Sequence, residues 1–255
     1  MPNLLAQLAT DSLRLGKASA AIHLTAGCLA LVFGLIATFT RKGAGRHRLA
    51  GKIGVGLLLV VVSTAFVLLI LLDVLPMPGN ISYKQDAVDL LALLFLTGTY
   101  TTLQGYRWAV NHKPKLDSDV VLMGMAAFIS IFSFYNAIAD LVLFPYTSTA
   151  KALPMTPLTA IMITFAIGGL FAYFSYDDIK TYLKGKVTPQ ERVLKHTYRI
   201  MTAVGGVFMA VAITNLGPIF VTNNWNPLPV YLVPPTLFGG MTMYLANRVS
   251  NPKSA

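Results

Sequence analysis

The chain has 255 residues, of which 55% are hydrophobic and only 12% are charged. Soluble domains carry about 25% charged residues, so this composition excludes an ordinary soluble domain. The net charge of +10 would indicate a nucleic-acid partner in a soluble protein. Here the placement of the cations beside hydrophobic stretches accounts for it, and we expect no nucleic-acid partner.

Hydrophobic stretches recur along the whole chain, and each approaches the ~20 apolar residues that a helix needs to cross a bilayer. The seven stretches fall near residues 18–39, 53–76, 88–109, 119–144, 157–176, 200–222 and 228–246. The sequence therefore predicts an all-α, polytopic membrane protein. We expect a bundle of about seven transmembrane helices that forms a single domain over residues 1–255.

The Lys and Arg residues are distributed unevenly between the two sides of this predicted bundle. The segments after the first, third and fifth stretches, with the C-terminal tail, hold sixteen of the twenty. The other side holds Arg14, Lys17, Lys84 and Lys151. Because cytoplasmic segments are enriched in Lys and Arg, this asymmetry predicts an N-terminus outside and a C-terminus in the cytoplasm.

The first segment, residues 1–17, is too polar to form the apolar centre of a signal peptide. Its leucines recur near helical spacing, at Leu4, Leu5, Leu8 and Leu15. This pattern predicts a short amphipathic helix on the outer surface of the membrane.

Polar residues near the outer ends of several stretches form one candidate site, which consists of His23, Asp89, Asn136 and Asp140. Asn136 and Asp140 are one helical turn apart and share a face. An ionisable group inside a membrane helix is costly and usually marks a polar pathway or a paired site. With His23, Asp140 would bind a proton or a divalent metal. The alternative is that Asp140 lies near enough to the interface to reach water.

The segment 177–199 predicts a helical hairpin that projects into the cytoplasm. Gly185 is a typical helix stop. The run from Thr188 to Glu191 is a capping box with Pro189 at the first helical position. A second helix therefore begins there and continues unbroken into the sixth hydrophobic stretch.

Histidines at the inner boundary form the second candidate site. Folding the hairpin about its turn places His196 level with Asp177 and Asp178, so a carboxylate would hold the imidazole in one tautomer, as for metal- or haem-bound histidine. The alternative is an ion pair that locks the two helices. His47 shares this depth, so His47, His196 and Asp177 are the candidate ligand set for haem b or a divalent metal. Because His47 lies between two arginines, contact with lipid phosphates is the alternative for it.

The seventh stretch contains Pro234 and Pro235, which lack the backbone N–H donor. We therefore expect this helix to kink or open there. Broken membrane helices often line binding sites, whereas a kink merely lets neighbouring helices pack.

Three short motifs recur in a known family: Ile22-His23-Leu24-Thr25-Ala26-Gly27, Arg41-Lys42-Gly43 and His47-Arg48-Leu49-Ala50-Gly51. With them the chain resembles an uncharacterised family of bacterial predicted multi-pass membrane proteins. Asp177-Asp178 and His196-x-x-Arg199-x-Met201 are similar to a second motif of that family, although Met201 does not directly follow Arg199. The resemblance is strongest in the first, second, fifth and sixth stretches. It implies that His23, His47, Asp177 and His196 occupy motif positions, and it implies no reaction.

No nucleophile–base constellation supports a hydrolase or transferase, so the sequence favours a non-catalytic role. The interpretation that we favour is an accessory or scaffold subunit of a membrane assembly in a bacterial inner membrane. Its expected partners are the lipid bilayer and other membrane subunits. Two alternatives stay open: a haem- or metal-binding redox module, and a small proton-coupled transporter or channel that runs past Asp140 and the seventh helix.

Overall fold

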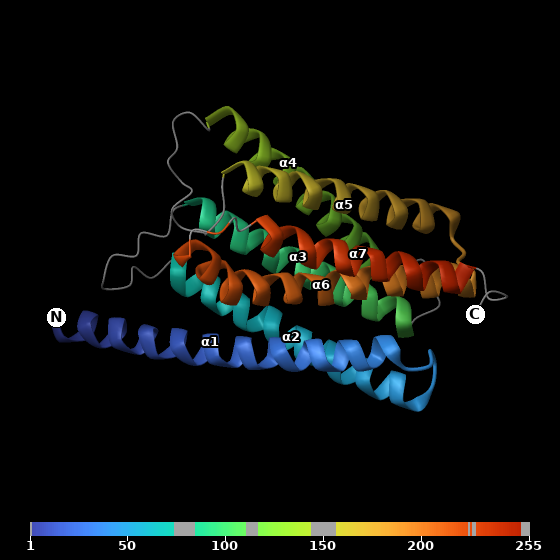
Figure 1. Ribbon diagram of the computed structural model, residues 1–255, viewed down its shortest axis with the longest axis horizontal. Coiled ribbons are helices and arrows are strands. Elements are labelled where there is room, and N and C mark those ends of the chain that lie inside the picture. Colours follow the sequence, from blue (N-terminus) through green and yellow to red (C-terminus); the bar gives the residue numbers. More distant parts are fainter. Residues whose placement is uncertain are drawn as a thin grey trace. The chain divides into compact units, whose positions relative to one another are not determined.

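The computed structural model describes residues 2–73, 85–110, 117–143, 157–223, 225 and 228–250. This part of the chain is all-helical, which confirms the predicted fold class (Figure 1). Each hydrophobic stretch overlaps one helix. The helices are α1 (Pro2–Phe39), α2 (Gly45–Asp73), α3 (Gln85–Val110), α4 (Asp117–Leu143), α5 (Pro157–Lys184), α6 (Pro189–Thr222) and α7 (Leu228–Ser250).

Four of these helices contain segments that are long and apolar enough to cross a membrane. Within the described residues, the segments are Arg14–Phe39, Gly45–Leu71, Asp117–Val142 and Pro189–Ile213. Each exceeds the ~20 residues that a bilayer requires. These helices fit a membrane protein, and they belong to α1, α2, α4 and α6.

The chain divides into two compact units, Met1–Thr99 and Tyr100–Ala255, with the boundary inside α3. In unit 1, α1 and α2 lie side by side as an antiparallel hairpin (Figure 1). Small residues allow this close approach: Ala26, Ala30 and Ala50 are buried in unit 1. The predicted segment 1–17 does not form a separate helix, because α1 runs without a break from Pro2 for 38 residues.

Two histidines tie α1 to α2. His23 Nδ1 lies 3.0 Å from Val61 O, and His47 Nδ1 lies 2.8 Å from Ala37 O. Because a carbonyl only accepts, each imidazole donates from Nδ1. Along each helix the two bonds lie 14 residues apart, from 23 to 37 in α1 and from 47 to 61 in α2.

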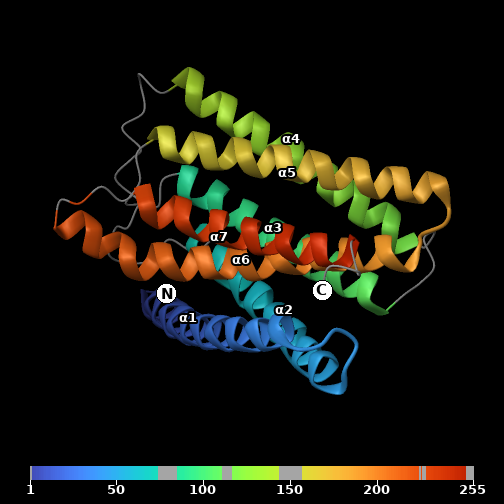
Figure 2. The same ribbon diagram turned by 45° about the vertical axis from the view of Figure 1, so that its right-hand side comes forward.

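In unit 2, α4 packs on α5 and α6 packs on α7 (Figure 2). Glycines allow close contacts in this unit. A Cβ added to Gly105 of α3 would lie 2.7 Å from Ile200 Cγ1 and 3.1 Å from Ile200 N of α6. The absence of a side chain at Gly105 therefore lets α3 approach the backbone of α6.

Helix α7 continues through its two prolines. Pro234 and Pro235 both lie inside Leu228–Ser250, so the opening that the sequence predicted as one outcome does not occur. Thr236 Oγ1 donates to Leu232 O at 2.7 Å, within the same turns. Of the two outcomes that the sequence left open, the opened helix is excluded, and a kink at the prolines stays a prediction.

The hairpin between α5 and α6 has the predicted local structure. Gly185 ends α5 with a φ of +65°, a conformation that glycine adopts without strain. Glu191 N donates to Thr188 Oγ1 at 3.1 Å, and Thr188 N donates to Glu191 Oε2 at 2.8 Å. This confirms the capping box, and Lys184 reinforces it with an ion pair to Glu191 at 2.8 Å. The turn therefore sets the end of α5 beside the start of α6.

Candidate functional site

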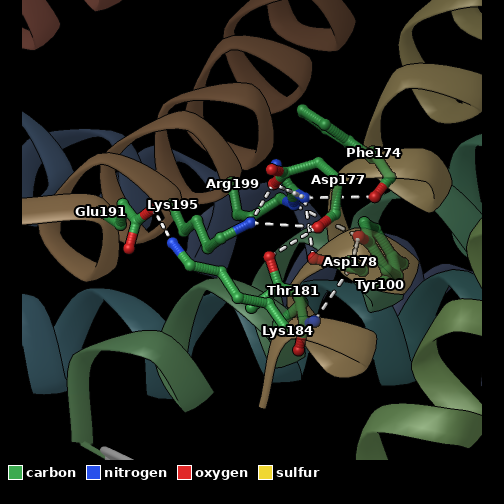
Figure 3. A network of polar contacts seen from close by, with 10 residues as sticks. Tyr100, Phe174, Asp177, Asp178, Thr181, Lys184, Glu191, Lys195 and Arg199 are labelled. Atoms are coloured by element: carbon green, nitrogen blue, oxygen red, sulfur yellow. Dashed lines mark hydrogen bonds and ion pairs between the residues drawn. The ribbon is translucent and has the colours of Figure 1, made fainter. Parts of the chain in front are cut away.

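Two carboxylates of α5 and two cations of α6 meet above this turn (Figure 3). Asp177 and Asp178 face Lys195 and Arg199, which are one helical turn apart on α6 and share a face. The two negative and two positive charges sum to zero. We call these four residues, together with Tyr100 and Gln104 of α3, the buried ion-pair network.

Arg199 is the centre of the network, and none of its side chain is exposed. Its Nη2 donates to Asp178 Oδ1 at 3.0 Å, to Asp177 Oδ2 at 3.2 Å and to Phe174 O at 3.4 Å. The guanidinium also rests on the Phe174 ring, with Cζ 3.7 Å from the ring centroid. Such stacking is favourable and suits the planar arginine head group.

Helix α3 supplies the remaining partners of Asp178. The Tyr100 hydroxyl donates to Asp178 Oδ2, and Gln104 Nε2 donates to the same oxygen at 2.9 Å. Tyr100 Oη also accepts from Arg199 Nε at 3.2 Å. Tyr100 and Gln104 are one turn apart, so a single face of α3 reaches the network. The network therefore connects α3, α5 and α6.

Lys195 and Asp177 form the less buried edge of the network. Lys195 Nζ pairs with the Asp177 carboxylate and lies 3.3 Å from Asp177 O, to which it also donates. Thr181 Oγ1 donates to the same carbonyl at 2.6 Å. The Asp177 side chain is 25% exposed, whereas that of Asp178 is 2% exposed. Solvent thus reaches the network at Asp177.

A second buried ion pair lies next to this edge. Arg107 of α3 pairs with Asp119 of α4, and their side chains are 8% and 6% exposed. The Arg107 guanidinium stacks on Trp108, with Cζ 3.9 Å from the ring centroid, and Lys195 Nζ lies 5.4 Å from that centroid. Through Trp108, the charged groups of α3, α4 and α6 form one continuous cluster.

The chemistry of the network follows from its burial. Removing an ion from water costs several kcal/mol, and only close partners with good hydrogen bonds offset that cost. Arginine stays protonated in proteins, so the charge on Arg199 is permanent. The charges are directed at each other rather than at solvent, which suits a structure that holds helices together.

The predicted inner site is arranged differently from the expectation. His196 Nδ1 donates to Gly105 O of α3 at 2.8 Å, while Asp177 and Asp178 bind the cations of α6. Successive residues of a helix point about 100° apart, so His196 faces α3 when Lys195 faces α5. Ion pairs do lock α5 to α6, as in the alternative interpretation given above. Their cations are Lys195 and Arg199 rather than His196. His47 belongs to unit 1 and His196 to unit 2.

The predicted outer residues are also divided between the units. His23 of unit 1 donates to Val61 O and lies 3.1 Å from Thr64 Oγ1. Asn136 and Asp140 of α4 belong to unit 2 and are both half-buried. The side chain of Asp89 lies outside the described residues. In the part of the chain that the structure describes, no three His, Cys, Asp or Glu side chains gather as a metal-ligand group.

Sequence reasoning did not identify the α3 and α6 members of the network as a site. Two signals were available. Tyr100 and Gln104 are polar residues one turn apart inside a hydrophobic stretch, and such pairs usually face a partner. Lys195 and Arg199 show the same spacing on the second arm of the predicted hairpin, opposite two adjacent aspartates.

Comparison with known proteins found no relative of this chain. No protein-family model, curated protein or solved structure matches this chain. The site is therefore interpreted from its own geometry.

We expect the Arg199→Met variant to lose about 3–5 kcal/mol of unfolding free energy, because Asp178 keeps a buried charge without its cation. The double variant Arg199→Met/Asp178→Asn restores neutrality and should recover part of that loss, through a coupling of about 0.5–3 kcal/mol. Both free-energy changes are measured by unfolding the purified proteins in detergent, with circular dichroism as the signal.

The matched control is Lys184→Gln, which breaks an ion pair whose two side chains are each 42% exposed. Exposed pairs contribute about 0–1 kcal/mol, so this variant should stay close to the wild type. A loss in Arg199→Met no greater than in Lys184→Gln contradicts a stabilising role for the network.

Proposed function

We propose that this chain is a seven-span protein of a bacterial inner membrane, with its N-terminus outside and its C-terminus in the cytoplasm. We further propose that it acts as a non-catalytic accessory or scaffold subunit of a membrane assembly. The four apolar helices and the placement of sixteen cations on one side support the membrane part of this proposal.

The single observation that carries the non-catalytic role is the mutual pairing of the buried charges in the ion-pair network. A charge that acts on a substrate or a proton must be reachable by it. In the network, Arg199 and Asp178 are almost entirely buried and each contacts an opposite charge. These groups hold α3, α5 and α6 together, and such rigidity is what a scaffold requires.

The surface of α4 supports a role inside a membrane. Large apolar side chains recur there at intervals of three and four residues, which places them on one face of the helix. All are more than half exposed: Phe128, Ile131, Tyr135, Ile138 and Val142. Such a face would meet acyl chains or a neighbouring membrane helix, since exposed apolar stripes of this length are rare on soluble proteins.

The proposal predicts that the protein resists a carbonate wash of the membranes and, after mild detergent extraction, migrates in a particle of greater protein mass than its own 27.6 kDa. The Arg199→Met/Asp178→Asn variant should keep this mass, because a scaffold needs the helices in place rather than the charges. Light scattering coupled to size-exclusion chromatography gives the protein mass. A particle that contains one chain alone would contradict the accessory role.

A second candidate function, haem or divalent-metal binding, rests on the tautomers of three histidines. His23, His47 and His196 each donate from Nδ1 to a backbone carbonyl. This bond places the proton on Nδ1 and favours Nε2 as the ligand atom, an arrangement common among metal-bound histidines. In each of these rings, a protein carbonyl therefore fixes the tautomer.

Haem binding predicts a Soret band in the purified wild-type protein and its loss in His196→Ala. Metal binding predicts a stoichiometric metal in elemental analysis that His196→Ala reduces. The matched control is Lys186→Gln on the hairpin turn. A wild-type protein with neither signal would remove this second candidate and leave the scaffold proposal unaffected.

A further inference from the structure

We infer that the turn between α1 and α2 binds the phosphate headgroup of an anionic phospholipid. The basic turn, as we call residues 41–52, carries five exposed cations in unit 1. They are Arg41, Lys42, Arg46, Arg48 and Lys52. This inference goes beyond the scaffold role, and it rests only on the membrane insertion that the proposed function includes.

The stretch of sequence around the basic turn contains no carboxylate. The sequence contains no Asp or Glu between Asp11 and Asp73. In the described part of unit 1, none of the five cations forms an ion pair. The hairpin between α5 and α6 differs, because Lys184, Lys195 and Arg199 all pair with carboxylates there. Within the described part of unit 1, the basic turn therefore carries a net positive charge that an anionic ligand would neutralise.

The backbone of the turn holds these cations in a fixed arrangement. Gly43 has a φ of +77°, and Ala44 N donates to Arg41 O at 3.1 Å. His47 Nδ1 donates to Ala37 O, which ties the first turn of α2 to the end of α1. The N-terminus of α2 adds unpaired backbone N–H groups and the positive end of the helix dipole. Such a terminus with nearby cations suits a phosphate group.

Apolar side chains beside the cations favour a lipid over a soluble phosphate. One candidate span ends at Phe39 and the next begins at Gly45, so residues 40–44 lie at headgroup depth once the helices are inserted, and Arg46 and Arg48 lie in the first turn of the second span. Phe39 is 77% exposed and Leu49 is 62% exposed. A phospholipid places acyl chains on these residues and its phosphate on the cations, whereas a free phosphate would contact the cations alone.

The test is native mass spectrometry of the purified full-length protein in detergent. Phosphatidylglycerol and phosphatidylcholine with identical acyl chains are titrated separately. We expect the wild type to bind phosphatidylglycerol more tightly. Because a cation near a membrane surface contributes about fivefold in affinity for an anionic lipid, Arg46→Gln/Arg48→Gln should weaken phosphatidylglycerol binding by about 25-fold. Phosphatidylcholine binding should not change.

The matched control, Lys180→Gln/Lys186→Gln, removes the same charge from the exposed surface of the α5–α6 hairpin and should leave phosphatidylglycerol binding unchanged. Equal binding of the two lipids by the wild type, or an equal loss in the control, overturns the inference. Displacement of phosphatidylglycerol by millimolar inorganic phosphate overturns the choice of a lipid. Carbonate resistance and helical content are measured on every variant, so a failure of membrane insertion is distinguished from a failure of lipid binding.

Discussion

Burying the Arg199 guanidinium among α3, α5 and α6 costs free energy that only a set of close, oppositely charged and hydrogen-bonding partners offsets. Each of these helices supplies part of that set: Tyr100 from α3, two aspartates from α5, and the arginine itself from α6. If one helix moved away, the charge would lose a partner while it stayed out of water. The spacing of these helices in unit 2 is therefore coupled to the network.

Two basic segments of the chain are predicted to lie on the cytoplasmic side, and their cations have different partners. In the α5–α6 hairpin, carboxylates neutralise Lys184, Lys195 and Arg199 within the protein. In the turn between α1 and α2, the cations are exposed and form no ion pair among the described residues of unit 1. The positive-inside rule counts both groups alike, because it concerns the cost of moving cations across a membrane. The structure separates cations that pair with carboxylates from cations that form no ion pair within the described part of unit 1.

Local features of the structure were predictable from the sequence, and tertiary ones were not. Gly185 and the capping box at Thr188 act within a few residues, so their pattern alone set the ends of α5 and α6. The partners of Asp178 come from positions 74 and 78 residues away, and no local pattern gives that pairing. Neighbouring residues of a helix lie at nearly the same depth in the membrane, but their side chains point about 100° apart. The predicted depth therefore could not show whether His196 or Lys195 faces the aspartates of α5. The prolines of α7 left a kink and an opening both possible, because propensity ignores the packing of α7 on α6.

The most direct test of this account is the thermal stability of Arg199→Lys in detergent, measured against the wild type. Lysine keeps the positive charge, but a single ammonium cannot reproduce the separate bonds that Nε and Nη2 make to Tyr100 and the two aspartates. If the fork-shaped guanidinium holds the three helices together, Arg199→Lys unfolds at a much lower temperature than the wild type. A midpoint equal to that of the wild type would contradict the account, because charge alone would then suffice.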